Sequence, residues 1–122
     1  MSAQKEQYFD MDDQVESWQH RIRALAPDIR AAEIAVFEAE AELKKRQAQL
    51  ELEALAAGIT TLGGQKQYAE STGSLFTARL VYGTAKGALA AKKIELKSVE
   101  VGFDEWRTRM ANAREERKKY GA

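Results

Sequence analysis

The sequence predicts an all-α fold: a long antiparallel helical hairpin, coiled-coil-like, that assembles into a homo-oligomeric bundle or ring. Each half of the chain carries apolar residues at alternating spacings of three and four, which is the pattern of long helices packed through a narrow seam. The 122 residues include a single proline and are rich in Ala, Glu, Lys, Arg and Leu, which favour helix. Charged residues make up 31% of the chain, a normal share for a helical rod with a large surface. We expect one domain at this length.

The first arm of the hairpin is predicted over residues 10–57, after a flexible acidic tail at 1–9 that carries no apolar repeat. Asp10, Asp12 and Asp13 open the arm, because carboxylates favour the N-terminal end of a helix. Its seam positions are all apolar except the arginine and the glutamate: Val15, Trp18, Ile22, Leu25, Ile29, Ala32, Val36, Ala39, Leu43, Arg46, Leu50 and Glu53.

Pro27 is expected to kink the first arm and Gly58 to end it, and a linker follows. Pro27 removes a backbone hydrogen bond, but the apolar repeat continues in phase beyond it, which indicates a kink and not an end. Gly58 is the expected stop of the helix. The linker, 58–74, is rich in Gly, Ser and Thr and is longer than a minimal helix–helix connection. A short helical turn around 65–69 fits inside it.

The second arm is predicted over 75–120, so that 10–122 forms a single helical-hairpin domain. A Ser or Thr within 71–74 can cap its start, and Gly121 is its expected stop. Its seam positions are all apolar except the lysine: Leu75, Ala78, Tyr82, Ala85, Leu89, Lys92, Leu96, Val99, Phe103, Trp106, Met110 and Ala113. Folding the second arm back on the first predicts these contacts: Trp18 with Met110, Ile22 with Trp106, Leu25 with Phe103, and Leu43 with Ala85. In this register small residues meet large ones in several layers, as in the last of these pairs.

A second apolar stripe on the second arm points to self-association. It is formed by Phe76, Leu80, Gly83, Gly87, Ala90, Ile94 and Val101. One partner helix cannot cover both stripes, so we expect this one to be the oligomer interface. Gly83 and Gly87 cost helix stability, and their spacing lets another backbone come close. The alternative is a hairpin whose glycine-rich middle merely bends.

Neither catalysis nor metal binding is expected. The only histidine, His20, occupies an outer helix position without cysteine or a second histidine, so it does not make a metal site. Gly63 and Gly64 are not followed by the Lys of a phosphate-binding loop. We therefore expect no enzyme and no cofactor. No apolar run approaches the roughly 20 residues that span a bilayer, and the N-terminus lacks a signal segment, so a cytoplasmic protein without membrane contact is expected.

Charge is uneven although the net charge is zero. A basic cluster, the candidate nucleic-acid site, lies near the C-terminus: Arg107, Arg109, Arg114, Arg117, Lys118 and Lys119. Repeated in an oligomer, it would make multivalent contacts to phosphates. The alternative is that the basic end complements the acidic residues of 1–16. The segment 8–13 mixes aromatic and acidic residues, as a docking peptide for a basic groove would, or as a helix lead-in does.

The layout resembles the phage recombination mediator family of the UvsY type. The features that carry the resemblance are Trp18 with the long helix AEAELKKRQAQLELEALAAG at 39–58, the linker TTLGGQKQYAESTGS at 60–74, and a second helix ending in FDEWRTRMANAREERKKYG at 103–121. The resemblance implies a helical ring that binds single-stranded DNA. It also implies a role in loading a recombinase onto strands coated by single-strand-binding protein.

Together these observations predict a non-enzymatic, phage-type accessory protein of DNA recombination. It would bind single-stranded DNA, a recombinase or single-strand-binding protein as an oligomer in the host cytoplasm. The alternative is a coiled-coil protein-binding module, such as an adaptor, an assembly factor or an inhibitor of a host protein, with no nucleic-acid binding.

Overall fold

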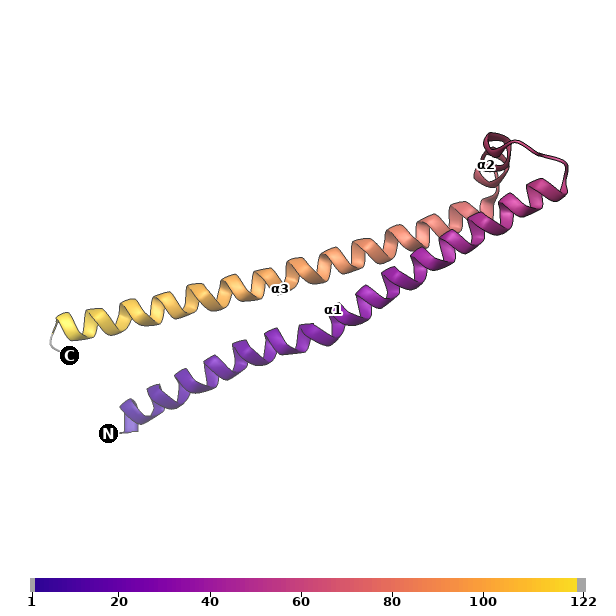
Figure 1. Cartoon of the computed structure of the whole chain (residues 1–122). Helices are drawn as coiled ribbons and strands as arrows, with labels where there is room; N and C mark the ends of the chain where they lie inside the picture. Colours follow the sequence, from indigo (N-terminus) through magenta and orange to yellow (C-terminus); the bar gives the residue numbers. More distant parts are fainter. Residues whose placement is uncertain (1, 121–122) are drawn as a thin grey trace. The chain divides into compact units, whose positions relative to one another are not determined.

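The structure, a computed structural model, describes the backbone of residues 2–120 and the side chains of 11–120. Within this part of the chain there are three helices and no strand (Figure 1): α1 is Ser2–Ala56, α2 is Leu62–Glu70 and α3 is Gly73–Lys119. The predicted all-α class is confirmed. The expected stop at Gly121 lies outside the described residues.

Contacts divide the chain into two units, and each unit contains part of α1 and part of α3. Unit 1 comprises the residues up to Asp28 together with those from Lys92 onward. Unit 2 comprises Ile29–Ala91, which includes α2. In α1 the boundary falls after Asp28, one residue beyond Pro27, whose ring leaves one backbone bond of the helix unmade.

α1 starts earlier than the sequence indicated and passes through its proline. The helix begins at Ser2 and not at Asp10, so Asp10, Asp12 and Asp13 lie inside it and do not open it. The side chains of 2–10, which include most of the expected acidic tail, lie outside the described residues. The helix continues through Pro27, as the unbroken apolar repeat predicted.

Gly58 ends α1 in the manner expected. Its φ is +94°, a left-handed conformation that glycine adopts without steric cost. Around it the Gly58 amide donates to the carbonyl of Leu55 and the Ile59 amide donates to that of Ala54, each at 3.0 Å. These two bonds form a Schellman motif, which satisfies carbonyls that the last turn of a helix leaves without partners.

The linker contains a full short helix, longer than the turn expected around 65–69. Thr61 caps α2: its hydroxyl accepts from the Gly64 amide at 3.2 Å. At the other end the hydroxyls of Ser71 and Thr72 donate to the Tyr68 carbonyl, at 2.8 and 3.1 Å. These hydroxyls therefore complete the C-terminal turn of α2. Thr72 stands directly before α3, as expected of a capping residue, but its carbonyl accepts from the Leu75 amide, at 3.2 Å, while its hydroxyl bonds back to α2.

The core of unit 2 joins all three helices. Leu50 of α1, Ala69 of α2 and Leu75 of α3 form a buried cluster, and Leu43 packs against it. Leu75 is the largest fully buried side chain among the described residues, with 1% exposure. Ala54 is also fully buried. α2 thus closes one end of the seam between α1 and α3, which a direct turn between two helices would leave open.

The seam of unit 1 is aromatic. The rings of Trp18 and Phe103 stack with their centroids 6.1 Å apart. A Cβ atom placed on Gly102 would come within 3.0 Å of the Trp18 ring, so the absence of a side chain at Gly102 lets the indole lie against α3. Asp28 and Lys92 form an ion pair at 3.9 Å. This pair is a second contact between α1 and α3 within the unit.

The predicted pairing register is wrong by one heptad. Trp18 was expected opposite Met110, but it lies against Phe103 and Gly102. The same shift removes the expected pair of Leu25 with Phe103. A slip of one heptad leaves every a and d position in the seam, so the repeat itself cannot choose between the two registers. The fit of an indole over one glycine distinguishes them, and the repeat does not encode that fit.

Candidate interaction surfaces

The second apolar stripe of α3 lies on the side of the helix away from its seam. All seven residues predicted for the oligomer interface are exposed: Phe76, Leu80, Gly83, Gly87, Ala90, Ile94 and Val101. Phe76 and Ile94 keep 63% and 69% of their surface exposed. Leu80 follows the half-buried Ala78 by two residues, which places it roughly 200° around the helix. Exposed apolar side chains gathered on one face are typical of an interaction site.

The two glycines of this stripe have no role within the described residues. A Cβ atom placed on Gly83 or on Gly87 would meet nothing within 4 Å. Each glycine costs a helix about 1 kcal/mol relative to alanine, and no contact of the described chain offsets that cost. The flat strip that they leave is wide enough for another helix to approach closely.

α1 has a second apolar stripe in unit 2 that the sequence analysis missed. Its members are all exposed: Ile34, Phe37, Ala41, Ala48, Leu52 and Leu55. Phe37 has 74% of its surface exposed, although Ala39, two residues on, is buried in the seam. The signal was present in the sequence, since each member lies two residues from a seam position. Its apolar residues are interrupted by lysines, which hid the repeat.

The basic cluster predicted to bind nucleic acid lies on the exposed surface at the end of α3. Its six members are Arg107, Arg109, Arg114, Arg117, Lys118 and Lys119, all of them exposed. Arg107 pairs with Asp104 at 3.9 Å and lies over the Phe103 ring. For the other five, no ion pair with residues 11–120 is present. The cluster therefore keeps most of its charge available for a ligand.

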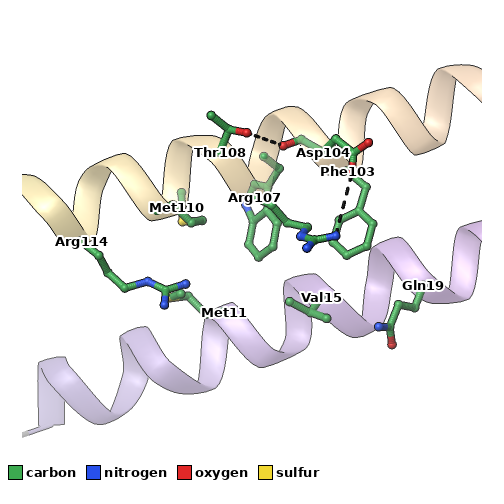
Figure 2. Close-up of a pocket in the computed structure, with 11 residues that line it drawn as sticks. Met11, Val15, Gln19, Phe103, Asp104, Arg107, Thr108, Met110 and Arg114 are labelled. Carbon is green, nitrogen blue, oxygen red and sulfur yellow. Dashed lines mark hydrogen bonds and ion pairs between the residues drawn. The ribbon is translucent and has the colours of Figure 1, made fainter.

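A groove of about 810 Å³ lies beside this cluster in unit 1 (Figure 2). α1 lines it with Met11, Val15 and Gln19, and α3 lines it with Phe103, Asp104, Trp106, Arg107, Thr108, Met110, Ala111 and Arg114. The Arg114 side chain reaches from α3 toward Met11 of α1 (Figure 2). Thr108 donates to the Asp104 carbonyl at 3.0 Å. The groove thus combines an apolar, partly aromatic lining with two guanidinium groups.

Of the expected docking segment at 8–13, only the last three side chains are among those the structure describes. Met11 lines the groove of unit 1, and Asp12 and Asp13 are exposed.

Within residues 11–120 the charged side chains form few ion pairs with one another. Among the side chains of residues 11–120 no group of three His, Cys, Asp or Glu is placed to hold a metal ion, and His20 is exposed. The strongest pair joins Glu70 of α2 to Arg79 of α3 by two hydrogen bonds. The hydrogen bonds from Arg79 hold the pKa of the Glu70 carboxyl below its ordinary value and, reciprocally, raise the pKa of Arg79. This pair ties α2 to the start of α3.

Within the described residues, no helix has the length and apolar content needed to cross a bilayer. No protein-family model matches the chain, and no curated protein or solved structure is significantly similar to it. Inference about function therefore depends on the exposed helix faces, the basic cluster and the groove.

Proposed function

We propose that this protein is a non-enzymatic helical assembly module that works by self-association, as one antiparallel hairpin per copy. The observation that carries the proposal is the pair of exposed apolar stripes, one on α1 and one on α3. On α1, Phe37 and Leu52 are 74% and 65% exposed, and on α3 Phe76 is 63% exposed. An isolated exposed apolar residue needs no explanation, but two stripes that follow the helical repeat favour burial against other helices.

The small interior of the chain supports the same proposal. Buried apolar residues in the described part of the chain are few: Leu25, Ala39, Leu50, Ala54, Ala69, Leu75 and Val99. Three of these are alanines, which contribute little apolar area. Two helices in contact have little interior of their own, so packing against further copies is the ordinary way for such a chain to bury its remaining apolar surface.

Sedimentation velocity over a concentration series tests this proposal. We expect the wild-type mass to be a multiple of 13.7 kDa and to fall on dilution. Replacing stripe residues by polar ones, as in Leu80→Gln with Phe76→Gln, should shift the mass toward the monomer. Ala88→Gln is the matched control, because Ala88 is exposed on the same helix outside the stripe. A wild-type chain that stays monomeric at high concentration contradicts the proposal.

The basic cluster and the groove favour a second function, binding of single-stranded DNA by a phage-type accessory protein of recombination. Trp106 and Phe103 in the groove are half-buried, and exposed ring surface of this kind can stack on bases. Arg107 and Arg114 also line the groove, where guanidinium groups can bind phosphates. In this function the protein stabilises one nucleoprotein state over another, with a recombinase or a single-strand-binding protein as further partner.

A fluorescence titration with a labelled single-stranded oligonucleotide at several salt concentrations tests the second function. The variant Arg114→Ala, Arg117→Ala, Lys118→Ala, Lys119→Ala should bind more weakly, and its salt slope should fall by up to roughly 3. The control removes the same charge from exposed sites elsewhere: Arg30→Ala, Lys44→Ala, Lys45→Ala, Lys66→Ala. Equal loss in both variants, or no binding by the wild type, removes the DNA-binding assignment.

A further inference from the structure

The α1 stripe in unit 2 and the α3 stripe, which continues along that helix from unit 2 into unit 1, are complementary to each other in charge. Between Ala31 and Leu43, the flanks of the α1 stripe carry four acids and no base: Glu33, Glu38, Glu40 and Glu42. Between Gly73 and Ile94, α3 carries four bases and no acid: Arg79, Lys86, Lys92 and Lys93. Of these bases, Arg79, Lys86 and Lys93 follow one another along one edge of the α3 stripe, seven residues apart. An acidic helix face and a basic one therefore stand on the same chain.

Two of the four bases are paired, Arg79 with Glu70 and Lys92 with Asp28 and Glu95, but most of the other charges remain available. Glu40 pairs with Lys44 at 3.2 Å, but among the described residues Glu33, Glu38 and Glu42 form no ion pair. On α3, Lys86 lies over the ring of Tyr82, 4.8 Å from its centroid, and the described residues offer Lys93 no carboxylate within ion-pair distance.

The two stripes also match in shape. From Ile34 to Leu55 the α1 stripe spans roughly 32 Å of helix, and from Phe76 to Val101 the α3 stripe spans roughly 38 Å. The α1 stripe projects the bulky side chain of Phe37, which is 74% exposed. The α3 stripe offers a strip without side chains at Gly83 and Gly87, where an added Cβ would meet nothing within 4 Å. A projecting ring on one face fits the space on the other.

We infer that the acidic outer face of α1 in one copy docks on the basic outer face of α3 in a second copy. The inference rests on the proposed self-association and specifies how it occurs. Pairing α3 with α3 would bring Lys86 and Lys93 against lysines of the same kind, and pairing α1 with α1 would bring glutamates together, both of which are unfavourable. Contact between two different faces is heterologous, so the assembly continues from copy to copy until it closes as a ring or extends as a filament.

Charge-reversed variants of the full chain test the inference. The α3-reversed variant carries Lys86→Glu and Lys93→Glu, and the α1-reversed variant carries Glu33→Lys and Glu38→Lys. By sedimentation velocity, each variant alone should associate at least about tenfold more weakly than the wild type, since attraction is replaced by repulsion. Mixing the two variants in equal amounts should restore the wild-type mass, because each reversed face then meets a reversed partner and each native face a native one. A chain with all four substitutions should also associate.

Two controls complete the design. Lys66→Glu with Lys118→Glu changes the net charge as much as the α3-reversed variant does, but away from both stripes, and should leave the mass unchanged. Circular dichroism of every variant should show wild-type helicity.

The outcomes separate this inference from the proposal beneath it. A monomeric wild type overturns both. A wild-type oligomer that neither reversed variant weakens, or a mixture that fails to recover, overturns the heterologous contact and leaves self-association standing. Stronger binding of the α3-reversed variant to the wild type than of the wild type to itself identifies an α3–α3 contact and likewise overturns it.

Discussion

The two units use the glycines of α3 in opposite ways. In unit 1, Gly102 lies beneath the Trp18 ring, and an added Cβ would stand 3.0 Å from that ring. In unit 2, Gly83 and Gly87 face open space. A glycine inside a helix is costly, so in both places a close approach is the natural reason for it. In unit 1 the group that approaches Gly102 is Trp18 of the same unit, whereas in unit 2 no described residue approaches Gly83 or Gly87.

The seams of the two units differ as well. Unit 2 has a cluster of Leu50, Ala69 and Leu75 that is closed by a third helix. In unit 1 the large side chains Trp18 and Phe103 are only half-buried, and a groove opens beside them. Tight packing therefore concentrates in unit 2, while unit 1 keeps aromatic surface within reach of a ligand.

The largest expected effect comes from breaking the closed cluster of unit 2. Leu75→Ala should lower the free energy of unfolding by about 3 kcal/mol, because it removes a side chain with 1% exposure and leaves a cavity among three helices. Urea unfolding followed by circular dichroism, at one fixed protein concentration, measures the loss.

The exposed Leu80 supplies the control for that experiment. Leu80→Ala removes the same atoms on the same helix from a side chain that is 55% exposed, and in dilute monomer it should change the free energy of unfolding by less than about 0.5 kcal/mol. Equal losses for the two variants would contradict the placement of Leu75 inside and Leu80 outside.

Which features of the fold could be predicted depends on whether the residues that determine each feature are close together in the sequence. Local signals sufficed for the all-α class, for the stop at Gly58 and for helix through Pro27, because each depends on residues within a turn or two. The predicted register was wrong because the register depends on one tertiary contact, the packing of the Trp18 ring against Gly102, which the apolar repeat does not encode. The predicted start of α1 near Asp10 is wrong because carboxylates favour the first turn of a helix but also occur inside one, as they do here.

For the surfaces, the exposed stripe of α3 was predicted and its exposure is confirmed, while its role as an interface stays a prediction. The α1 stripe was missed because Lys44 and Lys45 interrupt its apolar residues. Its relation to the seam becomes evident only when the buried Ala39 and the exposed Phe37 are seen two residues apart. The complementary charge of the α1 and α3 stripes could be recognised only after the structure had shown which residues form these two exposed faces.

Alanine substitutions at Gly83 and Gly102 test the difference between the glycines of the two units directly, with a smaller effect on stability. Gly83→Ala should raise the free energy of unfolding of dilute monomer by about 1 kcal/mol, since alanine favours helix and meets nothing. The same change should weaken self-association, because the added methyl group occupies the strip where another helix approaches. Urea unfolding and sedimentation velocity give the two readouts.

Gly102→Ala should lack that gain in stability. Its methyl group must displace the Trp18 ring, which is stacked on Phe103, and the cost of that displacement offsets the helical preference of alanine. The tryptophan emission spectrum should shift as the ring moves, whereas Gly83→Ala should leave it unchanged in dilute monomer. Equal stabilisation by both substitutions, with no spectral change, would show that the two glycines do not differ.

The smallest effect concerns the pair that ties α2 to α3 in unit 2. Hydrogen bonds from Arg79 hold the pKa of Glu70 below its ordinary value in the folded chain, which is about 4.3 for glutamate in an unfolded chain. Because the folded value is the lower one, the pair stabilises the fold above the unfolded pKa, and this contribution is lost as pH falls through the folded pKa. Both side chains are about half exposed, so solvent screening keeps the effect on stability small.

The titration of the Glu70 carboxyl carbon, followed by NMR, measures this shift without relying on stability. In the wild type its midpoint should lie below the ordinary value, and Arg79→Gln should return it toward that value because a neutral, shorter amide replaces the charged guanidinium that donates both hydrogen bonds. Lys66→Gln removes the same charge from α2 itself and should leave the midpoint where it is in the wild type. If both substitutions raise the midpoint equally, the shift arises from the general charge of the region, and the junction of α2 with α3 does not depend on a specific pair.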